Sequence, residues 1–167
     1  MSQVLIAFGS NLGDRLRHLQ AAADALSSVI HWQRLSHVYS TDPMYVTDQP
    51  AFLNAAGLGY TSRDPVQLLA ELKRTEQALG RQERERFGPR EIDIDLIDYE
   101  NAVIHTEQLI VPHPRFAERP FVLRPLQDVA PDWKLGDFSV RQWNETTDHA
   151  FGSVIKVEDA VLSLPSR

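Results

Sequence analysis

Short apolar runs along the chain predict strands, and apolar residues at intervals of three and four predict helices between them. The predicted strands are Val4 to Phe8, Trp32 to Tyr39, Phe52 to Thr61 and Ile92 to Tyr99, with Val103 to His105 as a hairpin partner of the last. One helix is expected from Asp14. A second follows Asp64 and Pro65, because aspartate is a preferred N-cap and proline suits the first helical position.

The segments between these elements are predicted loops. Ser40 to Pro50 contains two proline turns, and Arg81 to Arg90 shows no apolar period. Val111 to Pro114 is not expected to be a regular helix, because each of its prolines restricts the residue before it. Phe116 to Val129 is expected to be a short helix that is interrupted at both of its prolines.

The order strand, helix, strand, strand, helix, strand favours an α+β fold in which helices pack on one antiparallel sheet. We therefore expect a ferredoxin-like three-layer sandwich. A length of 167 residues fits a single domain over residues 1–167. Within it, residues 132–167 are expected to form a peripheral C-terminal segment.

Composition narrows the class of protein. The net charge is −6, whereas a protein that coats nucleic acid usually carries a positive charge. No apolar run is long enough for a membrane span, and the N-terminus has no recognisable signal peptide. The lack of cysteine excludes disulfides and fits a cytoplasmic location. We expect a monomer without nucleic-acid or membrane partners.

The basic residues are clustered. The two groups are Arg81, Arg84, Arg86 and Arg90, and then Arg115, Arg119 and Arg124. An acidic chain with local arginine clusters suits a small anionic ligand better than a long polyanion. The alternative is that these arginines are solvated surface charges.

The segment Glu91 to Leu96 alternates acidic and aliphatic residues. On a strand, alternate side chains share a face, so Asp93 and Asp95 project side by side roughly 6–7 Å apart. Two such carboxylates can hold one magnesium ion or a pair of ions. Alternation alone also describes a half-buried strand with its polar face in water, but repeated aspartates on one face of a strand repel each other.

The arginine-rich loop runs directly into this acidic strand. Metal-binding carboxylates beside a movable arginine loop are the groups that phosphoryl transfer uses, because the guanidinium groups neutralise charge on the transferred group. A local alternative is that Glu83 and Glu85 pair with these arginines.

Four blocks of the sequence resemble the 6-hydroxymethyl-7,8-dihydropterin pyrophosphokinases over about residues 4–131. The blocks are Ala7-Phe8-Gly9-Ser10-Asn11-Leu12-Gly13, Asp48 to Ala56, Arg86-Phe87-Gly88-Pro89-Arg90-Glu91-Ile92-Asp93-Ile94-Asp95-Leu96-Ile97, and Val111-Pro112-His113 with Arg119-Pro120-Phe121-Val122-Leu123. The resemblance implies an enzyme of folate synthesis that moves pyrophosphate from ATP to the pterin alcohol and releases AMP. It also implies that the glycine-containing turn supports the pterin pocket rather than phosphate.

The resemblance further implies a role for particular residues. Asp93 and Asp95 would hold two magnesium ions. Arg81, Arg84 and Arg90 would come from, or flank, the loop that closes over the site. The implied ATP contacts are Glu76, Arg81, Arg90, His113 and Arg119. The implied pterin contacts are Thr41, Met44, Phe52, Asn54, Phe87 and Phe121, with the phenylalanines Phe52 and Phe121 stacking on the flat ring.

Some positions depart from the family pattern, and two of them, Gln108 and Ile110, fall near the implied nucleotide site. The departing positions are Asp42, Lys73, Phe87, Gln108, Ile110 and Pro114. The departures at Gln108, Ile110 and Pro114 leave open a nucleotide- or pterin-binding relative without transferase activity. A metal-dependent phosphohydrolase that needs no pterin is a further alternative.

Overall fold

The computed structural model describes residues 1–42, 48–82, 84, 88–100, 102–147 and 154–165. In this part of the chain the main sheet is antiparallel and has the strand order β10-β3-β4-β1-β5, with β2 also paired to β4. Its strands are β1 (Ser2–Ser10), β2 (His31–Leu35), β3 (Tyr39–Thr41), β4 (Phe52–Thr61), β5 (Asp93–Tyr99) and β10 (Val154–Lys156).

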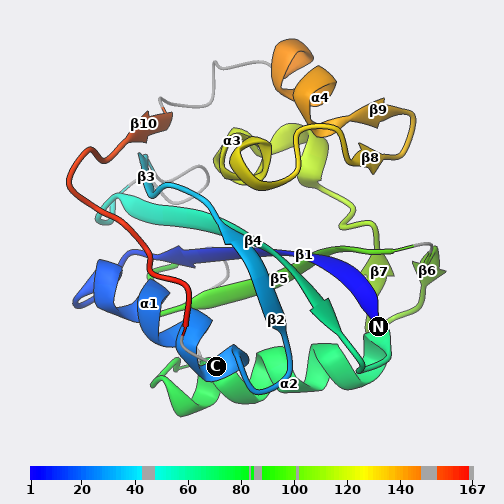
Figure 1. The fold of residues 1–167 in the computed structure, drawn as a ribbon. Coiled ribbons are helices and arrows are strands. Elements are labelled where there is room, and N and C mark those ends of the chain that lie inside the picture. The colour runs from blue at the N-terminus through cyan, green and yellow to red at the C-terminus, as the bar shows by residue number, and fades with distance from the viewer. Residues whose placement is uncertain (43–47, 83, 85–87, 101, 148–153, 166–167) are drawn as a thin grey trace.

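Helices cover both faces of this sheet (Figure 1). The helices are α1 (Arg15–Leu26), α2 (Pro65–Ala78), the 3-10 helix η1 (Phe116–Glu118), α3 (Pro120–Val129) and α4 (Val140–Thr146). Two small hairpins pair β6 (Ile104–His105) with β7 (Ile110–Val111) and β8 (Lys134–Leu135) with β9 (Phe138–Ser139). Since α1 and α2 lie on one face and α3 and α4 on the other, the predicted α+β sandwich on an antiparallel sheet is confirmed.

Strand β1 explains why there are two cores. Its alternate side chains point to opposite faces, as strand geometry requires. Ile6 and Phe8 pack into the core beneath α1 and α2, whereas Leu5 and Ala7 belong to the core beneath α3. Burying an isoleucine, leucine or phenylalanine side chain contributes roughly 1.5–3 kcal/mol. Packing on both faces therefore stabilises the sheet.

The predicted strand from Trp32 to Tyr39 is in fact two strands, β2 and β3, which both pair with β4. The break falls at Ser36. Its backbone N–H donates to the Ala56 carbonyl at 2.8 Å, and its hydroxyl oxygen accepts from the Ala56 N–H at 2.8 Å. A side chain therefore replaces a backbone carbonyl in the ladder at this point.

The segment from Phe116 to Val129 breaks only at the first of its two prolines. Pro120 is the first residue of α3, as expected, whereas Pro125 lies inside that helix. The expected interruption at Pro125 is therefore wrong. Pro125 is buried beside Leu123 and Leu126 on the apolar face of α3, and this packing offsets the one helical hydrogen bond that proline lacks.

The described part of residues 132–167 reaches both cores. Leu135 and Val140 pack into the core beneath α3, and Ala160 and Leu162 into the core beneath α1 and α2. Strand β10 pairs with β3 at the edge of the main sheet. This segment, expected to be peripheral, thus carries buried apolar side chains. Among the described residues, no helix has the length and apolar character of a membrane span.

Candidate active site

A cavity opens at the end of the sheet where β1 ends and where β4, β5 and α3 begin. It encloses about 740 Å³, including its open mouth. We call it the aromatic cavity, because Phe8, Phe52 and Phe121 line it. The site residues that the sequence predicted and that this cavity brings together are Thr41, Phe52, Asn54, Arg90, Asp93, Asp95, Arg119 and Phe121.

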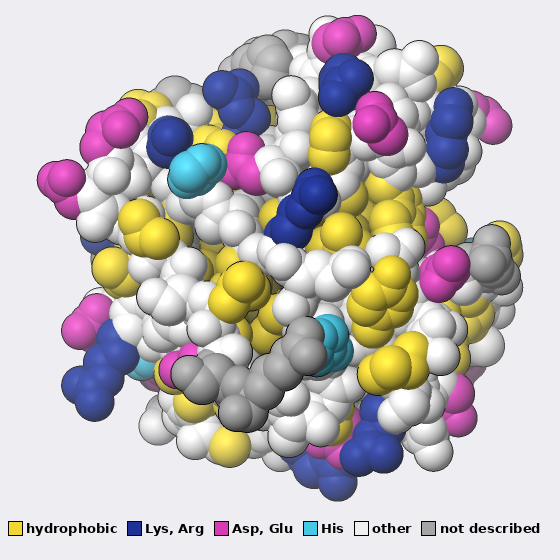
Figure 2. Space-filling view, viewed as in Figure 1, with side chains coloured by type: hydrophobic (Ala, Val, Ile, Leu, Met, Phe, Trp, Pro, Cys, Tyr) yellow, Lys and Arg dark blue, Asp and Glu magenta, His cyan; other side chains and the backbone are white. Residues whose placement is uncertain are grey.

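A second cavity lies between α2, β5 and the segment 107–114, and encloses about 650 Å³. Its polar lining includes Asp95, His113, Lys73 and Gln108. Asp95 lines both cavities, so the two cavities adjoin at this residue. On the face drawn in Figure 2, hydrophobic side chains gather below the layer of α3 and α4, and most charged side chains lie toward the edge.

The two aspartates share one face of β5. Ile94 and Leu96, which alternate with them, are buried in the core beneath α1 and α2. Asp93 and Asp95 therefore project to the opposite face, toward the start of α3. Burial of the apolar face of β5 therefore fixes the direction in which its acidic face points, and the two aspartates share one face as the sequence predicted.

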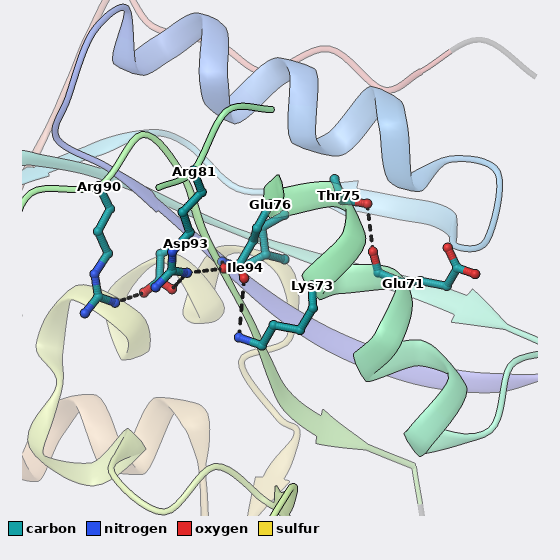
Figure 3. A network of polar contacts seen from close by, with 8 residues as sticks. All are labelled: Glu71, Lys73, Thr75, Glu76, Arg81, Arg90, Asp93 and Ile94. Carbon is teal, nitrogen blue, oxygen red and sulfur yellow. Dashed lines mark hydrogen bonds and ion pairs between the residues drawn. The ribbon is translucent and has the colours of Figure 1, made fainter. Parts of the chain in front are cut away.

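The two carboxyl groups have opposite pKa shifts. Burial raises the pKa of Asp95 to about 7, and the neighbouring charge of Asp93 adds to this effect. Burial also acts to raise the pKa of Asp93, but Arg90 and Arg81 outweigh it and hold that pKa below its usual range. Arg81 Nη1 lies 2.8 Å from Asp93 Oδ1, and Arg90 Nη1 lies 3.2 Å from Oδ2 (Figure 3).

Glu76 is the buried centre of a polar network beside these aspartates (Figure 3). It is 2% exposed. Its Oε2 accepts from the backbone N–H of Ile94 at 2.7 Å and from Arg81 at 2.5 Å, and its Oε1 lies 3.3 Å from Lys73 Nζ. Burial and the charge of Asp93 raise the pKa of Glu76. Glu76 lines neither cavity and instead fixes Arg81 and the edge of β5.

The other loop residues that the sequence predicted for the site either line neither cavity or lie outside the described residues. Arg84 makes a forked ion pair with Glu91, with both N–O distances at 2.7 Å, and lines neither cavity. Met44 and Phe87 lie outside the described residues, as do Glu83 and Glu85. The structure therefore places an arginine pair beside Asp93, while the roles predicted for Arg84, Met44 and Phe87 stay predictions.

Asn54 lies in the wall of the aromatic cavity, where a hydrogen bond fixes its side chain. This side chain is buried, and its amide donates to the Thr41 hydroxyl at 2.7 Å. Gly9 on β1 allows close contact here, because a Cβ at that position would lie 3.1 Å from Asn54 Oδ1. An amide held next to two aromatic rings can read the donor and acceptor edge of a flat heterocycle.

Arg119 carries an unpaired buried donor. Among the described residues, its Nε is the buried side-chain nitrogen or oxygen atom without a hydrogen-bond partner. Its guanidinium carbon lies 5.7 Å from the centre of the Phe121 ring. A buried donor without an acceptor costs about 1–3 kcal/mol. An anionic ligand in the aromatic cavity would relieve this cost.

His113 is expected to be neutral at pH 7. Burial lowers its pKa to about 4, and the positive charge of Arg119 acts in the same direction. Its Nδ1 accepts from the backbone N–H of Arg115 at 3.2 Å. The ring proton is therefore assigned to Nε2, which makes His113 a hydrogen-bond donor in the wall of the second cavity.

This pKa predicts a pH dependence of stability. A folded-state pKa near 4, below the unfolded value of about 6.5, means that the unfolded chain binds the proton first as the pH falls. His113 therefore costs stability progressively between pH 6.5 and 4, by up to about 3 kcal/mol. His113→Asn keeps an acceptor for the Arg115 N–H and should flatten the dependence of Tm on pH in this window. Parallel Tm profiles for the two proteins would contradict the prediction.

The carboxylates fit a hard divalent cation. Within the described residues, no group of three His, Cys, Asp or Glu side chains is arranged to hold a metal by itself. Magnesium, however, is usually bound through one or two carboxylates together with water and substrate phosphates. Asp93 and Asp95 offer this ligand set, with arginines beside them for the phosphates.

An antiparallel α+β sandwich with paired carboxylates, arginines and an aromatic cavity is an arrangement suited to a protein that binds an anionic ligand next to a flat one. The comparisons with known proteins give the family. Residues 5–131 match the family model of 7,8-dihydro-6-hydroxymethylpterin-pyrophosphokinase (HPPK), and the chain belongs to this family. The resemblance found in the sequence is thereby confirmed.

Two bacterial relatives are of similar length. A 2-amino-4-hydroxy-6-hydroxymethyldihydropteridine pyrophosphokinase of Bacillus subtilis is 44% identical over 74% of this chain and 75% of its own length. Its counterpart in Aquifex aeolicus is 38% identical over 79% of this chain and 82% of its own length.

Other relatives are longer. A mitochondrial folate synthesis bifunctional protein of Pisum sativum is 42% identical over 90% of this chain, which spans only 29% of that protein. A crystal structure of HPPK-DHPS in complex with substrates superimposes with a TM-score of 0.72 at 14% identity, over 87% of this chain and 45% of the other. At that identity, the superposition shows a shared fold.

Sequence reasoning gave no site role to two residues, of which Lys73 was named only as a departure from the family pattern and Asn11 only as part of a resembling block. Lys73 lines the second cavity and forms an ion pair with Glu76, and its helical spacing from Leu69 was the available signal. Asn11, in the turn after β1, is 1% exposed and bonds to two separate loops. An asparagine between two glycines was a signal for a side chain that bonds to the backbone of neighbouring loops. Its partners could not be predicted, because they lie far away in the sequence.

Proposed function

We propose that the protein transfers a pyrophosphoryl group from ATP to 6-hydroxymethyl-7,8-dihydropterin in folate synthesis. The hydroxymethyl oxygen attacks the β-phosphorus of ATP, and the bond from that phosphorus to the α,β-bridging oxygen breaks. The alcohol proton leaves to solvent, and AMP departs with the bridging oxygen. The observation that carries this proposal is the position of Asp95 in the walls of two adjoining cavities, one aromatic and one with a mixed polar and apolar lining.

The pterin would occupy the aromatic cavity. Phe52 and Phe121 offer apolar faces for a flat ring, and Asn54 offers an oriented amide. A ring in this position would direct its hydroxymethyl group toward Asp95. Met44 and Phe87 are proposed to complete this pocket, in line with the family resemblance.

The nucleotide would extend from Asp95 into the second cavity. His113 offers a neutral N–H donor there, and Arg119 offers its unpaired buried donor from the adjoining wall. Arg81 and Arg90 lie beside Asp93 and would neutralise the charge of the β- and γ-phosphates. Arg84 is proposed to join them from the same loop. Glu76 supports this site by fixing Arg81.

Magnesium dependence is part of the proposal. Asp93 and Asp95 would hold two ions against the triphosphate, and bound magnesium supplies charge neutralisation on the phosphate oxygens. This chain's own residues supply orientation. Among the described residues at the site, none is an obvious strong base for the alcohol, so positioning is expected to provide most of the catalysis.

A single assay tests the function. Purified protein is incubated with ATP, magnesium and the hydroxymethyl dihydropterin, and AMP is measured against ADP and phosphate. AMP that appears only when both pterin and magnesium are present supports the transferase. Phosphate release without pterin would indicate a phosphohydrolase, and binding of both ligands without any product would indicate an inactive relative.

The assignment of the aromatic cavity predicts a selective defect. Asn54→Leu keeps the volume of the side chain but removes its donor and acceptor. Loss of two hydrogen bonds at about 1 kcal/mol each should raise the KM for the pterin roughly 10–100-fold. In steady-state kinetics, the KM for ATP of this variant should stay within about threefold of the wild-type value. Thr41→Val removes the acceptor of the Asn54 amide and, because Thr41 also lines the aromatic cavity, serves as a milder variant of the same pocket.

We also propose that the protein acts as a monomer in the cytoplasm. The residues proposed to bind the pterin and the nucleotide lie in two adjoining cavities of one chain, which supports this proposal. Light scattering during size-exclusion chromatography at assay concentrations tests the oligomeric state. A dimer that dissociates with loss of activity would contradict it.

A further inference from the structure

Asn11 is bonded to two loops that border the aromatic cavity from different parts of the chain. It directly follows β1, whose last residues reach the cavity, and it is 1% exposed. Its side-chain amide donates to Gln49 Oε1 at 2.9 Å and to the Pro50 carbonyl at 3.1 Å. Its Oδ1 accepts from the backbone N–H of Arg90 at 2.8 Å.

A backbone bond strengthens the contact with the second loop. The Asn11 N–H donates to the Arg90 carbonyl at 3.1 Å, so both backbone groups of Arg90 are held by one residue. Arg90 in turn contacts Asp93 through its side chain. A continuous set of hydrogen bonds therefore leads from the segment 49–50 through Asn11 to a carboxylate proposed to hold metal.

Both loops touch the proposed substrate site directly. Gln49 and Arg90 line the aromatic cavity, whereas Asn11 does not. A ligand in the cavity would thus contact Gln49 and Arg90, and Asn11 connects these two residues from outside the cavity lining. Its three side-chain hydrogen bonds use both donors and the acceptor of the amide, a combination that aspartate cannot provide.

We propose that Asn11 is a positioning residue that couples pterin binding in the aromatic cavity to the placement of Arg90 at the phosphate site. The inference rests on the proposed function for the identity of the two ligands. Ordering of the segment 49–50 by the pterin holds Asn11, which then holds the Arg90 backbone. The consequence is positive coupling between the pterin and the nucleotide, and this coupling is reciprocal.

The test uses Asn11→Asp. Aspartate keeps an oxygen for the Arg90 N–H but loses both donors to Gln49 and Pro50. Binding of the pterin is measured by calorimetry with and without magnesium and an ATP analogue that has a methylene group in place of the α,β-bridging oxygen. In the wild type we expect the analogue to tighten pterin binding at least tenfold. In Asn11→Asp the ratio of the pterin Kd without the analogue to the pterin Kd with it should fall below about threefold. The Kd of each ligand measured alone should change by a smaller factor than this ratio does.

Arg15→Met is the matched control. Arg15 donates to the Ala51 carbonyl at 2.9 Å and so holds the same loop as Gln49, but no described hydrogen bond joins it to Arg90. This variant should loosen the segment 49–52 and retain the coupling factor. A purely structural role of Asn11 predicts instead that both variants lower Tm and leave coupling unchanged, which would overturn the proposal.

Hydrogen exchange separates this inference from the proposed function. Without any ligand, amides in the segment 88–92 should exchange at least fivefold faster in Asn11→Asp than in the wild type or Arg15→Met. Equal rates would overturn the tie through Asn11, whatever the substrates are. Faster exchange in a protein that binds no pterin would uphold the tie between the loops but overturn its proposed use in coupling these two ligands.

Discussion

Asp95→Asn is expected to lower kcat for AMP formation by roughly 10²–10⁴-fold, because a bound metal supplies several kcal/mol of charge stabilisation in the transition state. Asparagine has the same shape but no charge, and its amide nitrogen replaces one of the two carboxylate oxygens at a residue that lines both cavities. The measurement is single-turnover AMP formation at saturating pterin, ATP and magnesium.

The same substitution should leave the fold intact. In the ligand-free protein the Asp95 carboxyl is destabilised by burial and by Asp93, which together raise its pKa to about 7. Removing the charge relieves this repulsion, so the Tm of Asp95→Asn in chelator at pH 8 should equal or exceed that of the wild type. Raised stability with lost activity is the pattern of a functional rather than a structural residue.

Asp137→Asn is the control for charge. Asp137 lies in the exposed turn between β8 and β9 and lines neither cavity, so the variant changes the net charge equally without touching the site. It should keep wild-type kcat. Wild-type turnover in Asp95→Asn itself would remove the basis of the magnesium assignment and, with it, the proposed alignment of ATP.

Arg119→Met should lower kcat/KM for ATP roughly 10²–10³-fold. A hydrogen bond to a charged group contributes about 1.5–3 kcal/mol, and a guanidinium can make two such bonds to one phosphate. Methionine keeps the apolar stem but provides no donor. The Nε of Arg119 is buried without a hydrogen-bond partner among the described residues, so loss of this donor breaks no hydrogen bond within the fold.

Arg119→Lys tests the geometry of this contact. Lysine keeps the charge but cannot form the forked pair, so an intermediate loss of about tenfold is expected. Arg141→Ala, which removes an exposed ion pair with Asp132, should leave kcat/KM unchanged. If Arg119→Met bound ATP normally but unfolded at a lower temperature, the residue would be structural and the phosphate contact would be wrong.

The sequence predicted local features well where one physical signal dominates. The cap at Asp64 with Pro65 fixed the start of α2. The alternation of Asp93 and Asp95 with aliphatic residues placed both carboxylates on one face of β5. The break at Ser36 was not predictable, because it depends on bonds to Ala56 on a strand twenty residues away. Pro125 was misjudged because the packing of α3 outweighs the local preference of proline.

The same division applies to the site. Asp93, Asp95, Asn54 and Phe121 were candidates from the sequence blocks, and the fold brings them to one cavity. The buried position of Glu76 behind the site, rather than in a cavity, follows from its bonds to Arg81 and Ile94. No local pattern reveals such a network, since its partners come from α2, the following loop and β5.

By itself, the amino-acid sequence determined the α+β class, the family and the chemical types of group at the site, because periodicity and local motifs are written in neighbouring residues. Only the tertiary structure decided that Asp95 stands between two cavities, that Arg119 has an unpaired buried donor, and that Asn11 joins two loops. These properties arise from contacts between distant segments, whose geometry depends on how both faces of the sheet are packed.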